Sequence, residues 1–214
     1  MLPRLYPIVD AACFASANDP LDALLHHARE LIRAGANILQ YRDKSNDARQ
    51  FLTTARELRR LAGRAVQLVM NDRADLCLAA NFDGVHVGQD DLSPADVRTI
   101  IGPHRLVGFS THNPEQVKLA DAMPVDSIAV GPVFATSSKA NPDPVIGLEG
   151  IRLARQLTGK PLVAIGGITR ATCRSVVEAG ADSVAVISDL LERPYEAAAE
   201  FLHLLSPQTA QRNS

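Results

Sequence analysis

The stretch "PLVAIGGITRATCRSVVEAGADSVAVIS" (Pro161–Ser188) contains the unit on which the whole chain is built. It reads as a short apolar strand, a turn with two adjacent glycines, a helical pattern that ends near Gly180, and a second apolar strand. Both strand segments are too uniformly apolar to have a face suited to solvent. Such strands are typical of parallel sheets that are covered by helices. The stretch therefore predicts a βαβ unit.

The same unit recurs from one end of the chain to the other. The 214 residues hold eight pairs of a short apolar run and an amphipathic run, with no low-complexity linker between them. An open, doubly wound sheet also uses such units, but eight in this length match the smaller (β/α)8 barrels. The first turn also lacks the G-x-G-x-x-G of a dinucleotide-binding sheet. We therefore predict a single-domain α/β protein, a (β/α)8 TIM barrel over about 5–205, with a disordered tail at 206–214.

Helix boundaries are marked by capping residues. Asp19 and Ser93 each precede a proline, the pattern of an N-cap followed by proline in the first turn. Several helical patterns end in a glycine suited to left-handed geometry at the C-cap: Gly35, Gly63, Gly159 and Gly180.

Composition excludes several classes of protein. Hydrophobic residues make up 46% and charged residues 21%, and the formal net charge of -2 gives no reason to expect nucleic acid or an acidic membrane as partner. The three cysteines are far apart and lack C-x-x-C spacing, which indicates free thiols in a reducing compartment. No signal peptide or membrane span is evident. We expect a cytoplasmic protein whose partners are small molecules, and a homo-oligomer is compatible with the sequence.

Polar residues concentrate where the predicted strands end, which is where TIM barrels build their active sites. After the second to fourth strands come Arg42, Lys44, Asp72 and Asp91. Two carboxylates on neighbouring strands can converge on one hard cation, and two cations beside it suit a diphosphate. Each residue alone can equally be a helix cap or a solvated loop charge. The four together on adjacent strands favour a site.

A second cluster of polar groups follows the sixth to eighth strands. "AIGGIT" (Ala164–Thr169) places two glycine amides where a strand becomes a helix, a position suited to an anion. "FATSSK" (Phe134–Lys139) lies in the longest predicted loop, 132–147, and its hydroxyls and lysine can bind phosphate or form a mobile surface turn. Among the histidines, His86 is expected to be a satisfied barrel residue, and His112 is a candidate proton carrier. The two clusters imply a reaction that joins two organic pieces with loss of diphosphate.

Five stretches resemble the thiamine-phosphate synthase family. They are "QYRDK", "VMNDRADLCLAANFDGVHVGQDDL", "VGFSTHN", "AVGPVFATSSK" and "VAIGGI…EAGADSVAVIS", in the order and spacing of that family, and the resemblance runs from Tyr6 to about Leu190. The resemblance implies a transferase of thiamine biosynthesis. It would condense 4-amino-2-methyl-5-pyrimidinylmethyl diphosphate with 4-methyl-5-(2-phosphoethyl)thiazole, or its carboxylated form, to give thiamine phosphate and diphosphate.

The resemblance also implies roles for individual residues. Asp72 and Asp91 would hold Mg²⁺, with Asp90 a neighbour at which the family varies. The pyrimidine diphosphate would be bound by Gln40, Arg42, Lys44, Asn71, Ser110 and Lys139, of which Arg42, Lys44, Ser110 and Lys139 would also act in catalysis. The thiazole phosphate would be bound by Thr136, Ser137, Ser138, Gly167, Ile187 and Ser188. The implied mechanism is dissociative, with diphosphate leaving before the thiazole nitrogen attacks. Ser138 stands where the family usually has a second threonine, which keeps a hydroxyl there.

Three alternatives stay open. A thiazole tautomerase of the same fold would use His112 for a proton shift and would not need the complete diphosphate and metal set. A sugar-phosphate epimerase would use Asp72 and Asp91 as an acid/base pair. A non-catalytic protein that binds thiamine phosphates would bind product without turnover.

Overall fold

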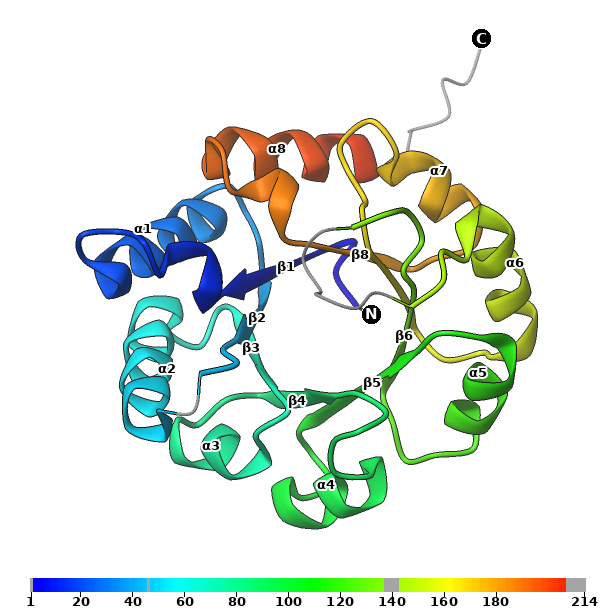
Figure 1. Cartoon of the computed structure of the whole chain (residues 1–214), viewed down its shortest axis with the longest axis horizontal. Helices are drawn as coiled ribbons and strands as arrows, with labels where there is room; N and C mark the ends of the chain where they lie inside the picture. Colours follow the sequence, from blue (N-terminus) through cyan, green and yellow to red (C-terminus); the bar gives the residue numbers. More distant parts are fainter. Residues whose placement is uncertain (1, 46, 137–142, 207–214) are drawn as a thin grey trace, which may run out of the picture.

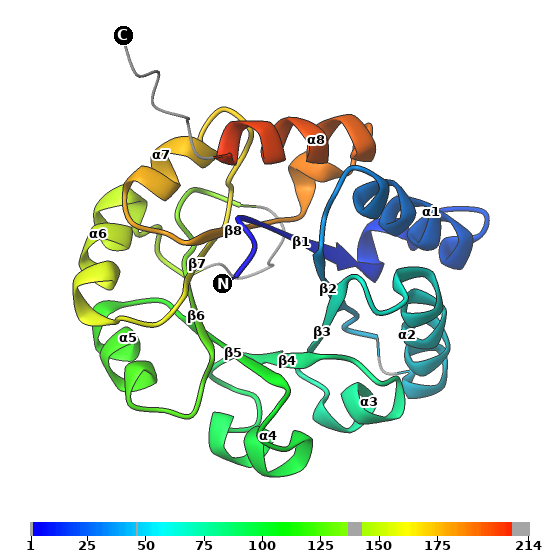
Figure 2. The ribbon, with the colours of Figure 1, turned by 180° about the vertical axis from the view of Figure 1, so that it is seen from behind.

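A computed structural model describes residues 2–45, 47–136 and 143–206 and confirms the predicted TIM barrel. Eight parallel strands close in sequence order, and the helices form an outer ring that is visible from both sides (Figures 1 and 2). The strands are β1 (Leu5–Asp10), β2 (Ile38–Arg42), β3 (Gln67–Asn71), β4 (Gly84–Val87), β5 (Leu106–Thr111), β6 (Ser127–Val130), β7 (Leu162–Ile165) and β8 (Ser183–Val186).

Each strand is followed by a helix on the outside of the barrel. Two short 3-10 helices, which the sequence did not predict, follow the first and last strands. The helices are α1 (Pro20–Arg33), α2 (Ala48–Ala62), α3 (Ala74–Ala79), α4 (Pro94–Ile101), α5 (Pro114–Asp121), α6 (Gly147–Leu157), α7 (Cys173–Glu178) and α8 (Pro194–Leu205), and the 3-10 helices are η1 (Ala11–Phe14) and η2 (Ser188–Leu190).

The apolar residues form two cores because successive side chains of a strand point to opposite faces. The larger core lies between the strands and the helices and includes Leu39, Tyr41 and Phe51. The smaller one fills the barrel itself, and consists of Tyr6, Ile8, Ile38, Val69, Ala129, Val163 and Ala185.

The same alternation places polar residues at the mouth of the barrel. Ile38 belongs to the inner core, so Gln40 and Arg42, two and four residues later on β2, face the same way. On β3, Val69 is followed in the same manner by Asn71. The interior of the barrel is thus apolar below and polar where the strands end, which is the feature that positions the site.

The helix boundaries follow the predicted caps, with one exception. Asp19 accepts a hydrogen bond from Asp22 N at 3.0 Å and Ser93 accepts one from Asp96 N at 3.2 Å. Gly35, Gly63 and Gly180 have the positive φ angles expected at helix ends (109°, 58° and 119°). The same prediction for Gly159 is wrong.

Helix α6 ends instead at Leu157, and Thr158 is its C-cap in an extended conformation. The Thr158 hydroxyl donates to Asp121 and accepts from Lys160 N, which holds the chain in that conformation. A left-handed glycine is therefore not needed to end this helix.

The predicted loop 132–147 and tail 206–214 lie only in part within the described residues. The loop after β6 is described up to Thr136 and again from Asp143, and it ends where α6 begins at Gly147. Ser137, Ser138 and Lys139 lie outside the described residues, as does the tail from 207 onward. In the parts of the chain that are described, no helix is long and apolar enough to cross a bilayer.

A buried histidine makes the stability of the barrel depend on pH. His27 of α1 is 5% exposed and packs against Phe14, with ring centroids 5.2 Å apart. Burial, with a smaller contribution from His26, lowers the pKa of His27 from 6.5 to about 4. Between those values the unfolded chain binds a proton that the folded chain does not, so stability falls as the pH drops.

We predict that replacement of His27 by Leu weakens this dependence. In the wild type this one group lowers the free energy of unfolding by about 2 kcal/mol between pH 7 and pH 5. The variant His27→Leu should lose that contribution and keep its stability at pH 7. Urea unfolding at both pH values measures the effect, and His26→Leu on the exposed neighbouring position is the control. An equal pH dependence in wild type and His27→Leu would contradict the assignment.

Candidate active site

A cavity of about 540 Å³ opens at the carboxyl ends of the strands. Every predicted site residue that the structure describes lines it, whereas the predicted contacts at Ser137, Ser138 and Lys139 fall outside the described residues. The predicted residues that line it are Gln40, Arg42, Lys44, Asn71, Asp72, Asp91, Ser110, Thr136, Gly167, Ile187 and Ser188.

Both cations at the end of β2 are paired with carboxylates. Arg42 forms an ion pair with Asp10, which is 5% exposed and also accepts from Ala12 N at 3.1 Å. Lys44 forms an ion pair with Asp72 and is about half exposed. Sequence analysis assigned no role to Asp10. Its position opposite Arg42 in the β1–β2 register explains the pair.

Two carboxylates meet at the ends of β3 and β4. Asp72 has a left-handed conformation with φ of 63°, and its N–H donates to His86 O at 2.8 Å. Asp91 accepts from Gly88 N at 2.8 Å, which turns its carboxylate back toward the barrel. Burial raises the pKa of Asp72, the nearby Asp91 carboxyl raises it further, and the hydrogen bond from Lys44 opposes both.

This pair of acids fits a hard divalent cation. Two carboxylates within hydrogen-bonding reach repel each other when both are ionised, and the single Lys44 offsets only one of them. No group of three or more acidic, histidine or cysteine ligands occurs among the described residues. A cation held by Asp72 and Asp91 would therefore complete its shell with water or substrate oxygens, as Mg²⁺ commonly does. Asp90, beside them, is exposed and also lines the cavity.

The middle of the cavity is polar but uncharged. His86 Nε2 lies 2.8 Å from Ser110 Oγ. Gly108, opposite His86 on β5, makes room for the imidazole, since a Cβ there would lie 2.4 Å from His86 Nδ1. Burial lowers the pKa of His86 to about 4, so the ring is neutral at pH 7. The expectation of a satisfied histidine in the barrel is confirmed, but this one also lines the cavity.

An unpaired donor and an apolar floor complete this part of the cavity. Asn71 is buried, and its Nδ2 has no hydrogen-bond partner among the described residues. Gln40 Nε2 donates to Tyr6 Oη at 3.4 Å. A buried amide without a partner is costly, so Asn71 is available to a ligand. The apolar floor of the cavity consists of Tyr6, Ile8, Ala129, Val163, Ile165 and Ala185. Sequence analysis did not predict it, although the alternation of side chains along each strand would have indicated these residues.

The two glycines after β7 form a left-handed turn against the loop that follows β6. Gly166 and Gly167 have φ angles of 101° and 61°. A Cβ on Gly167 would lie 2.3 Å from Ala135 O, so only glycine fits there. The N–H of Gly167 donates to no residue in the described ranges. Gly167 lines the cavity together with Thr136, and its N–H is available to an anion there.

His112 joins the loops that follow β5 and β6. Its Nδ1 lies 2.8 Å from Gly131 O and 3.5 Å from a carboxylate oxygen of Asp143. Its backbone N–H donates to Gln116 Oε1 at 2.7 Å. These contacts make His112 a link between two loops at the rim of the cavity, and they occupy its Nδ1 atom.

Comparison with known proteins agrees with this geometry. Residues 5–190 match the family model described as thiamine monophosphate synthase. A thiamine-phosphate synthase of Koribacter versatilis is 59% identical over 95% of this chain and 96% of its own length. That of Chloroflexus aurantiacus is 44% identical over 86% of this chain and 83% of its own. The solved thiamine phosphate pyrophosphorylase of Pyrococcus furiosus superposes with a TM-score of 0.82 at 29% identity, over 94% and 95% of the two chains.

The match covers all eight strands, and both the sequence relatives and the solved structure carry the same activity in their names. The chain therefore belongs to the thiamine monophosphate synthase family.

Proposed function

We propose that this chain joins a pyrimidinylmethyl diphosphate to a thiazole phosphate, with formation of thiamine phosphate and release of diphosphate. The observation that carries the proposal is that one cavity has two separate sides whose residues suit anions. Arg42, Lys44, Asp72 and Asp91 lie at the ends of β2–β4, and the Gly167 turn lies across the barrel at β7. A reaction between two phosphorylated substrates needs this division.

The side at β2–β4 suits the leaving group. Arg42 is held by the buried Asp10, so its guanidinium is preorganised toward the cavity and can bind diphosphate oxygens. Lys44 is more exposed and can leave Asp72 to follow the diphosphate. Asp72 and Asp91 would hold Mg²⁺, which supplies charge neutralisation to the diphosphate oxygens when it is bound.

The middle of the cavity suits the pyrimidine. The apolar floor can contact the ring face, and Asn71 Nδ2 and Gln40 can meet its nitrogen atoms. The bond between the methylene carbon and the diphosphate oxygen breaks, and both electrons leave with diphosphate. The thiazole nitrogen then forms the new bond with its lone pair, so no base has to remove a proton. Neutral His86 adds no charge that would oppose the developing pyrimidine cation.

Three rival functions require less of this site. A tautomerase would depend on His112, but Nδ1 of that ring already contacts the backbone carbonyl of Gly131. A regulator that only binds thiamine phosphate would not need the two acids of β3 and β4 beside two cations. An epimerase that used Asp72 and Asp91 as its acid/base pair would give Arg42 and Lys44 no role in the reaction.

The test is an assay of diphosphate release by the purified protein. We expect release only when the pyrimidine diphosphate, the thiazole phosphate and Mg²⁺ are all present, with thiamine phosphate formed in equal amount. Binding of the thiazole phosphate without release would refute the proposal. A proton shift on the thiazole alone would favour the tautomerase.

The proposed metal ligands are tested by Asp72→Asn and Asp91→Asn. Each variant should lose Mg²⁺-dependent turnover by roughly 100-fold or more, since a ligand to the metal supports several kcal/mol of transition-state stabilisation. Asp75→Asn is the matched control, because Asp75 follows the same strand but pairs with Arg73 outside the cavity. Steady-state rates across a Mg²⁺ titration measure the effect. Full activity in either of the first two variants would remove that residue from the proposed metal site.

The proposed anion site at β7 is tested by Gly167→Ala. The substitution strains a left-handed residue by about 1–2 kcal/mol and pushes a Cβ against Ala135 O. We expect KM for the thiazole phosphate to rise about tenfold. Gly63→Ala is the control, since Gly63 has a similar φ of 58° but open space around it and lies at the end of α2. Equal kinetics in both variants would count against a phosphate site at this turn.

A further inference from the structure

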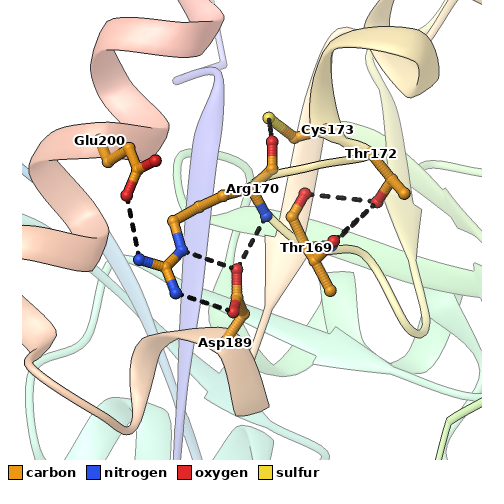
Figure 3. Close-up of polar contacts among 6 residues, drawn as sticks. All are labelled: Thr169, Arg170, Thr172, Cys173, Asp189 and Glu200. Atoms are coloured by element: carbon orange, nitrogen blue, oxygen red, sulfur yellow. Dashed lines mark hydrogen bonds and ion pairs between the residues drawn. The ribbon is translucent and has the colours of Figure 1, made fainter.

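One carboxylate joins the loop after β7 to the turn after β8. Asp189 accepts from Arg170 N at 2.8 Å, from Arg170 Nε at 3.1 Å and from Arg170 Nη2 at 3.2 Å (Figure 3). The remaining arm of the guanidinium, Nη1, donates to Glu200 of α8 at 3.0 Å. Three hydrogen bonds to one carboxylate fix both the distance and the angle between the two segments.

The backbone of Arg170 is also fixed from the other side. Thr169 N donates to the Thr172 hydroxyl at 3.0 Å, and Cys173 N donates to Thr169 O at 2.9 Å. Cys173 Sγ lies 3.5 Å from Arg170 O (Figure 3). The segment 169–173 is thus a closed turn, and a displacement of Arg170 would be passed to the two glycines, which lie three and four residues before it in the chain.

Both ends of this contact adjoin proposed phosphate contacts. Asp189 directly follows Ser188 within η2, and Arg170 is three residues after Gly167. Neither Arg170 nor Asp189 lines the cavity, whereas Gly167, Ile187 and Ser188 do. The contact therefore lies behind the anion site and does not form part of it.

We propose that Arg170 and Asp189 are positioning residues that hold the turns 166–168 and 187–188 at the separation a phosphate monoester requires. The inference rests on the proposed function and assigns a role to residues that do not touch substrate. The pair is partly exposed, at 37% for Arg170 and 20% for Asp189, so its charge alone would contribute little. We attribute its effect to the ordering of the two turns. A phosphate that bridged two mobile turns would bind more weakly, because binding would then include the entropic cost of immobilising them.

The consequence is selective for one substrate. The pyrimidine diphosphate is assigned to the β2–β4 side, which shares no contact with Asp189 in the described residues. Loss of the contact should therefore raise KM for the thiazole phosphate and leave KM for the pyrimidine diphosphate unchanged. It should also leave unchanged the inhibition constant of the thiazole alcohol, which lacks the phosphate.

The experiment compares Asp189→Asn, Asp189→Ala and Glu200→Gln with wild type in steady-state kinetics. Asp189→Ala should raise KM for the thiazole phosphate about tenfold, equivalent to about 1.4 kcal/mol. Asp189→Asn keeps an acceptor for Arg170 N and should raise it about threefold. Glu200→Gln removes charge only from the outer arm and should leave KM near the wild-type value. Thermal unfolding verifies that each variant is folded, and Asp189→Asn serves alone if the alanine variant is not.

Three outcomes would overturn the inference. One is an unchanged KM for the thiazole phosphate in the Asp189 variants. The others are an equal rise in both KM values, or an equal loss of affinity for the thiazole alcohol, since either would indicate general loosening of the barrel. Failure of the proposed function is recognised separately, because the wild type would then release no diphosphate in the same assay.

Discussion

The closure of eight parallel strands into one ring is the constraint on which the site depends. Because all strands run the same way, their carboxyl ends share one rim, and because side chains alternate, every second residue of each strand faces the interior. Residues as distant in sequence as Gln40 and Ile187 therefore line one cavity. The interior of the barrel is apolar where the strands begin and polar where they end. The charged side chains therefore lie at the mouth, where water and phosphate can reach them.

Most of the fold was predictable because its signals are local. Apolar runs, amphipathic runs and the caps at Asp19 and Ser93 each act within a few residues, and their number implies a barrel. The failures have two causes. Helix α6 ends through a contact of Thr158 with Asp121, 37 residues away, which no local pattern reveals. The two 3-10 helices, η1 and η2, span only four and three residues, which is too short to show a periodic pattern.

The site was predictable as a set of residues but not as a set of contacts. Position at a strand end was enough to select Arg42, Asp72 and Asp91, since the rim is common to all strands. The roles of Asp10 and His86 depend on which strands are neighbours and on their register, which places Asp10 opposite Arg42 and Gly108 opposite His86. Register is a property of the closed sheet, so these partners appear only in three dimensions.

Both cations at the end of β2 are paired with carboxylates of the protein itself. Arg42 pairs with Asp10, a buried acid that also caps a turn, and both side chains of this pair are largely shielded from solvent. Lys44 pairs with Asp72, one of the two acids proposed for the metal, and here the lysine is about half exposed. A divalent cation held by Asp72 and Asp91 would compete with Lys44 for Asp72 and would free the ammonium for the diphosphate. Metal and diphosphate binding would then be coupled through one lysine, and each would strengthen the other.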